Sequence, residues 1–152
     1  MKKAFIPILF ISLFMVSCKC SKNTQANEEV IEFSATDVWQ LTHMRGSKVT
    51  YNGSDPVTMQ FNPESGTVNG FAGCNRYFGN YTSKIADTPE SGTQGEITFN
   101  GVGATKMMCP EPEMRIEDKF LPLIEKSTRY SLSAYSLIIY QKDKEVMRFE
   151  KQ

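Results

Sequence analysis

The chain has 152 residues, which is enough for one domain and short for two. Its 17 Lys and Arg residues balance its 17 Asp and Glu residues, so the formal net charge at neutral pH is zero. Proteins that bind nucleic acid through its phosphates carry a clear basic excess, and nucleic acid is therefore not expected as a partner.

The first residues have the pattern of a bacterial signal peptide. Lys2 and Lys3 precede an almost unbroken apolar run from Ala4 to Val16. A run of about thirteen residues is too short for a helix that spans a bilayer, which needs roughly 20. We therefore predict that residues 1–17 are a signal peptide and that the protein is exported.

The end of this segment, Met-Val-Ser-Cys, is similar to the lipobox of bacterial lipoproteins. In a lipobox a small residue precedes the cysteine that receives the lipid, as Ser17 precedes Cys18 here. The open alternative is ordinary secretory cleavage nearby, which would leave Cys18 free. With Cys18 lipidated, the protein is expected in the bacterial cell envelope, held to the membrane through this anchor. The outer membrane, facing the periplasm or the cell surface, is the expected location.

Residues 18–36 are polar and show no sustained periodicity, so they are predicted to form the lipidated cysteine and a flexible tether. A coil of about 18 residues reaches on the order of 25 Å. The folded domain is expected to start near Asp37 and to occupy residues 37–152.

Short apolar runs alternate with turn signals through most of this domain, which is typical of antiparallel β structure. Val57, Met59 and Phe61, for example, alternate with polar residues, so one face of that strand should be buried. The predicted strands are 38–42, 57–61, 67–71, 77–82, 97–99, 129–133, 137–141 and 146–150.

One segment has helical periodicity instead. Residues 111–126 carry one apolar face, formed by Ile116, Phe120, Leu123 and Ile124. Pro122 lacks a backbone amide, so we expect the helix to kink or end near Phe120. The predicted fold is mainly β with one α-helix: a curved antiparallel sheet or incomplete β-barrel packed by that helix.

Two of the four cysteines, Cys74 and Cys109, belong to the predicted domain, whereas Cys20 lies beside the lipid anchor. Disulfides persist in exported proteins, so Cys74 and Cys109 are the natural pair. The closed loop of roughly 36 residues would contribute about 4 kcal/mol to the free energy of unfolding, less any strain.

Two other roles for these cysteines remain open at this point. His43 is the only histidine and could in principle activate a cysteine nucleophile, but no local motif marks such a pair. Thioether and thiolate ligands suit copper(I), and such ligands cluster in Met107, Met108, Cys109 and Met114. Methionines are also ordinary core residues. We therefore expect no metal, no cofactor and no enzymatic activity.

Three motifs together resemble the META domain family, which includes the heat-shock lipoprotein HslJ. They are "GCNRYFGNY", "TKMMCPEPEMRIEDKF" and "LSAYSLIIY", and the likeness covers roughly residues 37–150. The resemblance implies a small, mostly β fold with one helix and a disulfide between Cys74 and Cys109. The family has no established enzymatic activity. Its members are associated with heat shock, novobiocin tolerance, motility or virulence, and the fold is similar to that of lipid-binding secretion pilotins.

The stretch around Cys74 supplies the candidate contact residues. Its glycines are expected to permit bends, which leaves Asn75, Arg76 and Tyr77 as residues that could touch a ligand or partner. The carboxylates of the predicted helix are expected on its solvated side, and they are Glu111, Glu113, Glu117 and Asp118.

The favoured function is a non-enzymatic, lipid-anchored envelope module for binding, or for stress or antibiotic tolerance. It would bury an apolar small molecule or a segment of an envelope protein against the concave face of the sheet. The alternative is an inhibitor or accessory module of an envelope enzyme, such as a lysozyme or a protease. In that case the disulfide-held loop would present Arg76 and Tyr77.

Overall fold

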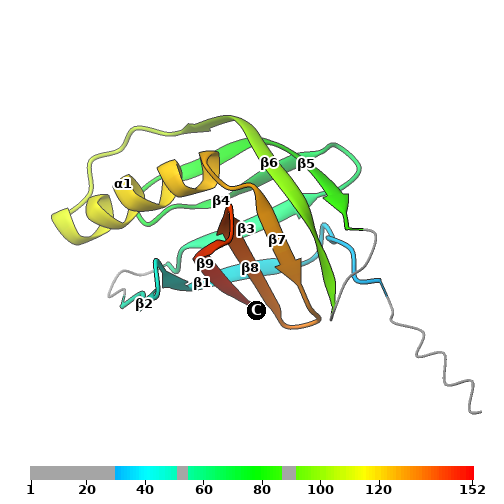
Figure 1. The fold of residues 1–152 in the computed structure, drawn as a ribbon. Helices are drawn as coiled ribbons and strands as arrows, with labels where there is room; N and C mark the ends of the chain where they lie inside the picture. The colour runs from blue at the N-terminus through cyan, green and yellow to red at the C-terminus, as the bar shows by residue number, and fades with distance from the viewer. Residues whose placement is uncertain (1–29, 51–54, 87–91) are drawn as a thin grey trace, which may run out of the picture.

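The computed structural model describes residues 30–50, 55–86 and 92–152. The predicted signal peptide, Cys18 and Cys20 lie outside these residues. The chain runs through ten elements (Figure 1): β1 (Val38–Met44), β2 (Ser47–Lys48), β3 (Thr58–Asn62), β4 (Thr67–Phe71), β5 (Arg76–Ile85), β6 (Thr93–Ala104), α1 (Glu111–Glu125), β7 (Arg129–Leu132), β8 (Ser136–Gln141) and β9 (Lys144–Lys151). The prediction of a mainly β protein with one helix is confirmed.

Within the described residues, eight strands close into a barrel. Each strand from β3 to β9 pairs antiparallel with the next, and β1 pairs with both β3 and β9. Leu41 lies opposite Phe149 across the closing seam, and Lys151 forms an ion pair with Asp37 at 2.7 Å. The expected alternative of an open, curved sheet is therefore not what forms. Closure leaves no unpaired strand edge in the ring.

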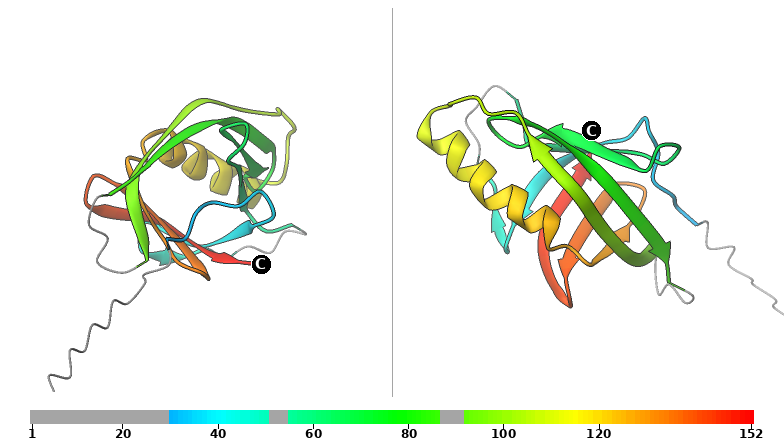
Figure 2. Two further views of the ribbon diagram at one scale, coloured as in Figure 1. Left: turned by 90° about the vertical axis from the view of Figure 1, so that its right-hand side faces the viewer. Right: turned by 90° about the horizontal axis from the view of Figure 1, so that it is seen from above.

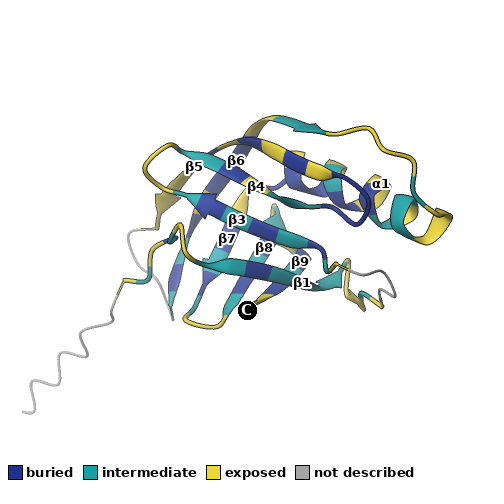
Figure 3. Cartoon of the chain, turned by 180° about the vertical axis from the view of Figure 1, so that it is seen from behind, coloured by how far each residue is buried: buried dark blue, intermediate teal, exposed yellow. Residues whose placement is uncertain are grey.

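The strands alternate between buried and exposed residues, as the sequence pattern predicted (Figure 3). On β5, Tyr77 and Tyr81 point inward while Arg76 and Phe78 point outward. An eight-stranded barrel is just wide enough for side chains to fill it. Large side chains occupy the interior, among them Trp39, Met59, Phe61, Ile97, Leu137, Ile139 and Phe149.

The sequence predicted that the helix kinks or ends near Phe120, and the helix does not end there. It continues to Glu125 with Pro122 inside it. A proline inside a helix costs about 3 kcal/mol, whereas burying a large aliphatic side chain gains about 1.5–3 kcal/mol. Leu123 and Ile124 are both fully buried, so their packing offsets the proline. Among the described residues no helix is long and apolar enough to cross a membrane.

The two ends of the barrel are covered by different segments (Figure 2). α1 lies across one end, where Phe120 packs on Tyr77 and Phe149. Residues 30–36, which we call the N-terminal strap, lie at the other end. There the ring of Phe33 stacks on Phe61 with 4.1 Å between ring centroids.

The strap corrects the predicted boundary between tether and domain. Phe33 is only 9% exposed and belongs to the core, and the amide of Ile31 donates a hydrogen bond to Thr93 Oγ1 at 2.8 Å. The packed domain therefore begins before Asp37. Val30, Ile31 and Phe33 are too few apolar residues to establish a period, and for that reason the sequence pattern did not place Phe33 in the core.

Candidate functional site

The disulfide expected from the sequence joins Cys74 to Cys109, with 5.8 Å between their Cα atoms. It connects the turn between β4 and β5 to the segment between β6 and α1. Gly73 precedes the first cysteine at a φ of 114°, a conformation that favours glycine. The turn therefore delivers Cys74 to the helix side of the barrel.

This bond removes the thiols on which the two alternative cysteine chemistries depended. Neither Cys74 nor Cys109 is a free nucleophile or a thiolate ligand in the oxidised protein. His43 Nδ1 lies 3.1 Å from Thr42 Oγ1 on β1. Within residues 30–50, 55–86 and 92–152 no group of three or more His, Cys, Asp or Glu side chains is arranged to hold a metal ion.

Asn75 is the centre of a buried polar network rather than a contact residue. Its Oδ1 accepts hydrogen bonds from the Met107 amide at 2.7 Å and from Thr105 Oγ1 at 2.8 Å. Its Nδ2 donates to Met107 O at 3.2 Å and to Glu117 Oε1 at 2.9 Å. An amide side chain has two N–H donors and one acceptor oxygen, so these bonds satisfy all the polar groups of the Asn75 side chain. At 1% exposure Asn75 does not reach a partner.

Glu117 is the functional residue that sequence reasoning misplaced. It was expected on the solvated side of the helix, but it is only 7% exposed. Its Oε2 accepts a hydrogen bond from the backbone amide of Asn75 at 2.6 Å, and its Oε1 accepts the bond from Asn75 Nδ2. The signal was present: residues 117, 120 and 124 have the spacing of one helix face, and Phe120 and Ile124 define that face as buried. The network therefore ties α1 to the turn at Cys74.

The other two candidate contact residues point in opposite directions, as strand alternation requires. Tyr77 faces inward and donates a hydrogen bond from its hydroxyl to Thr58 O at 3.0 Å. Burial raises the pKa of Tyr77 well above its ordinary value. Arg76 faces outward and is exposed. Of the three predicted contact residues, only Arg76 lies on the surface.

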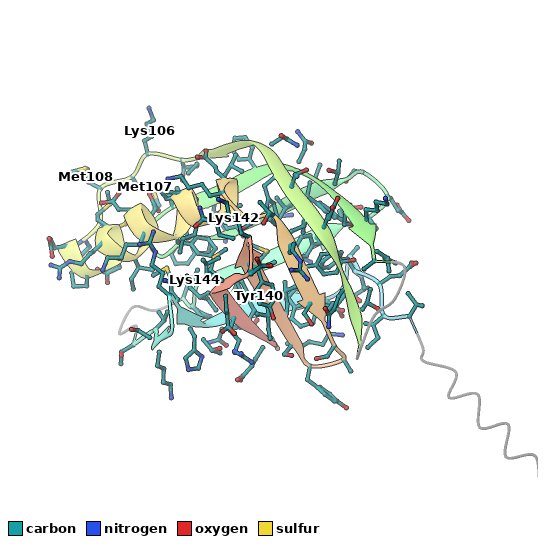
Figure 4. All side chains as sticks on the ribbon, viewed as in Figure 1. Lys106, Met107, Met108, Tyr140, Lys142 and Lys144 are labelled. Carbon is teal, nitrogen blue, oxygen red and sulfur yellow. A yellow bond between two sulfur atoms is a disulfide. The ribbon has the colours of Figure 1, made fainter. Side chains whose placement is uncertain are left out.

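The segment held by this network presents two methionines to solvent. We call residues 105–110 the methionine loop. Asn75 binds both the amide and the carbonyl of Met107, and the disulfide holds Cys109. Met107 is nevertheless 58% exposed and Met108 is 92% exposed. Figure 4 shows the side chains of Lys106 and Met108 pointing away from the barrel.

A surface hollow of about 580 Å³ lies beside the methionine loop. Its lining includes Phe71, Arg76 and Met107. An aromatic ring, a guanidinium group and a thioether together can accept an apolar side chain that carries an acceptor group. Asn75 holds the backbone of Met107 in this lining, so the point from which its side chain starts is fixed before any partner binds.

The comparisons with known proteins agree with this fold. No curated protein matches the chain. Two structures solved by NMR are similar in fold. One, from Burkholderia xenovorans, has 22% identity and a TM-score of 0.55, over 76% of this chain and 81% of the other. The second has 20% identity and a TM-score of 0.53, over 76% and 89%. The model of the META domain matches residues 32–152, and this protein therefore belongs to the META domain family.

Proposed function

We propose that this protein is a non-enzymatic, lipid-anchored binding module of the bacterial envelope, and that it holds a protein partner at the methionine loop. The observation that carries the proposal is the contrast within the loop itself. Its backbone is fixed by Asn75 and the disulfide, while Met107 and Met108 remain exposed to water.

The loop has the physical properties of a docking surface. Ordering a mobile loop costs free energy on binding, and a loop that is already ordered avoids much of that cost. Methionine is flexible and polarisable, so it adapts to the shape of a partner and is enriched in the cores of interfaces. Arg76 beside Met107 adds a donor that can orient the partner.

The barrel interior is the less favourable place for a ligand. The sequence suggested that an apolar ligand could lie against a concave sheet, but the ring of strands is closed and its inward face is covered by the protein's own side chains. Phe61, Phe120 and Phe149 are completely buried there. We therefore place binding on the outer surface.

The inhibitor alternative is weakened in its original form because it needs Tyr77 at the surface. Tyr77 is buried against Phe120, so the loop cannot present the pair of Arg76 and Tyr77. An envelope enzyme remains one kind of protein that could dock on Met107 and Met108.

The lipid anchor is supported by the sequence before Cys18 and is compatible with the arrangement of the domain. The strap, through which the chain enters the fold, lies at the barrel end opposite α1 (Figure 1). Met108 lies beside α1 in the same view (Figure 4). In a molecule anchored through Cys18, the connection to the membrane would therefore leave the domain at the end opposite the methionine loop.

Two measurements test the two parts of this proposal. Metabolic labelling with a fatty acid should mark the full chain and should fail for Cys18→Ser. Cross-linking in intact envelopes should give discrete adducts with the native chain and lose them for the double variant Met107→Asp/Met108→Asp.

The matched control is Tyr135→Asp, because Tyr135 is 80% exposed and lies between β7 and β8 rather than on the loop. It should keep every adduct. Adducts that survive in the methionine variant would contradict the docking role and leave the lipid anchor to be decided by the labelling result.

A further inference from the structure

The methionines of this protein differ sharply in their access to solvent. The described residues contain six, and two of them, Met59 and Met147, are completely buried. Met44 and Met114 are partly buried. Met107 and Met108 are the two with mostly exposed side chains, and they are adjacent on one loop. Oxidation of thioethers by water-soluble oxidants follows this access.

We propose that Met107 and Met108 form an oxidation site that consumes two equivalents of hypochlorous acid while the barrel stays folded. At each residue the thioether sulfur loses two electrons and forms an S–O bond. The O–Cl bond of the oxidant breaks, chloride leaves, and the hydroxyl proton is released to water. The product is methionine sulfoxide.

The contacts of the loop explain why the fold should tolerate this change. Asn75 holds Met107 through its backbone amide and carbonyl, and neither bond involves the side chain. The disulfide between Cys74 and Cys109 holds the loop at the residue that follows Met108. A sulfoxide oxygen at Met107 or Met108 therefore stays in water and breaks no hydrogen bond of the network. The same oxygen on Met59 or Met147 would enter the core without a partner.

The disulfide also favours oxidation at Met107 and Met108. Cys74 and Cys109 are joined to each other and do not offer the thiolates that oxidants attack first. In the described part of the chain, the exposed thioethers are then the most accessible reduced sulfur atoms. This inference rests on exposure and chemistry alone, and it concerns the chain whose methionine loop is not covered by a partner.

The test is a titration of the full chain with hypochlorous acid, followed by mass spectrometry of each methionine-containing peptide. Sulfoxide should accumulate at Met107 and Met108 before it appears at Met59 or Met147. If the buried pair is reached only by unfolding, its oxidation should be slower on the order of a thousandfold or more. Thermal unfolding of the doubly oxidised protein should remain cooperative.

The double variant Met107→Leu/Met108→Leu keeps the apolar volume and removes both sulfurs. It should lack the two sulfoxides assigned to the loop, whereas the half-buried control Met44→Leu should form both of them normally. Comparable rates at Met59 and Met107, or loss of the folded state at two sulfoxides per chain, would overturn the proposal.

Discussion

At the α1 end of the barrel, a disulfide and a buried amide–carboxylate pair fix two loops to a helix, whereas at the strap end the chain is held by the packed ring of Phe33 and by hydrogen bonds. At the α1 end, the elements are joined by the disulfide and by the hydrogen bonds from Asn75 to the carboxylate of Glu117. The strap end relies on Phe33 and on hydrogen bonds such as the one from Gln60 Nε2 to Ala35 O at 2.8 Å. We therefore expect the α1 end to keep a fixed surface and the strap end to be the one that opens locally.

Loss of the disulfide should lower the free energy of unfolding more than any other change proposed at the α1 end. Replacing both Cys74 and Cys109 by serine is expected to lower the free energy of unfolding by about 4 kcal/mol, because the unfolded chain regains a loop of roughly 36 residues. Urea unfolding measures the loss. Hydrogen exchange should speed up in the methionine loop and not in the strap. An equal increase in both places would contradict the separation of the two ends.

Phe33→Ala is the corresponding change at the strap end. Phenylalanine to alanine in a core costs about 3–5 kcal/mol, and we expect about 3 kcal/mol because the strap can detach without breaking the strand ladder. Limited proteolysis should cut the variant near residue 33 while the barrel survives. If the methionine loop became exchange-labile in the same variant, the ends would be coupled.

Glu117→Gln tests the buried network without changing the shape of the side chain. Hydrogen bonds to a charged group are worth about 1.5–3 kcal/mol, and the amide that replaces the carboxylate directs donors toward the donors of Asn75, so we expect a loss of about 2 kcal/mol. The control is Asp118→Asn on the exposed side of the same helix. It should leave the urea midpoint unchanged, and an equal loss in both variants would contradict the role assigned to Glu117.

Tyr77 should give the smallest effect, and one that depends on pH. Its pKa is raised by burial, so the folded state holds the phenolic proton more tightly than the unfolded state does. The resulting stability is present below the ordinary tyrosine pKa of about 10 and is lost as pH rises above it. Tyr77→Phe should lose about 1 kcal/mol at neutral pH with its hydrogen bond to Thr58. Its stability should then fall less steeply than that of the native chain above pH 10; parallel profiles would refute this account.

The sequence was most informative where the structure repeats a simple period. Alternation along β5 predicted that Tyr77 and Tyr81 share one face. The predicted export of the protein and the location of both cysteines inside the domain predicted the pair of Cys74 and Cys109. The apolar face of the helix was also predicted. The helix continues past Phe120, where the sequence allowed it to end, because packing of Leu123 and Ile124 offsets Pro122.

The features that the sequence did not predict depend on contacts between residues that are distant in the sequence. Pairing of Leu41 with Phe149 closes the barrel, but nothing local to either residue specifies that register. Asn75 and Glu117 are 42 positions apart in the sequence, so no local pattern showed that Glu117 has a buried partner. Glu117 was therefore predicted to lie on the solvated face of the helix. Of the candidate site, the sequence supplied the disulfide and Arg76, and only the fold revealed that Asn75 fixes the methionine loop.

The position of the strap has a mechanical consequence. In a molecule tethered through its N-terminus, any pulling force enters the domain at residue 30 and reaches Phe33 before it reaches β1. Extraction of that single ring would lengthen the connection to the membrane while the ladder between β1 and β9 stays intact. The strap would then yield first under load, and the methionine loop at the far end would keep its shape.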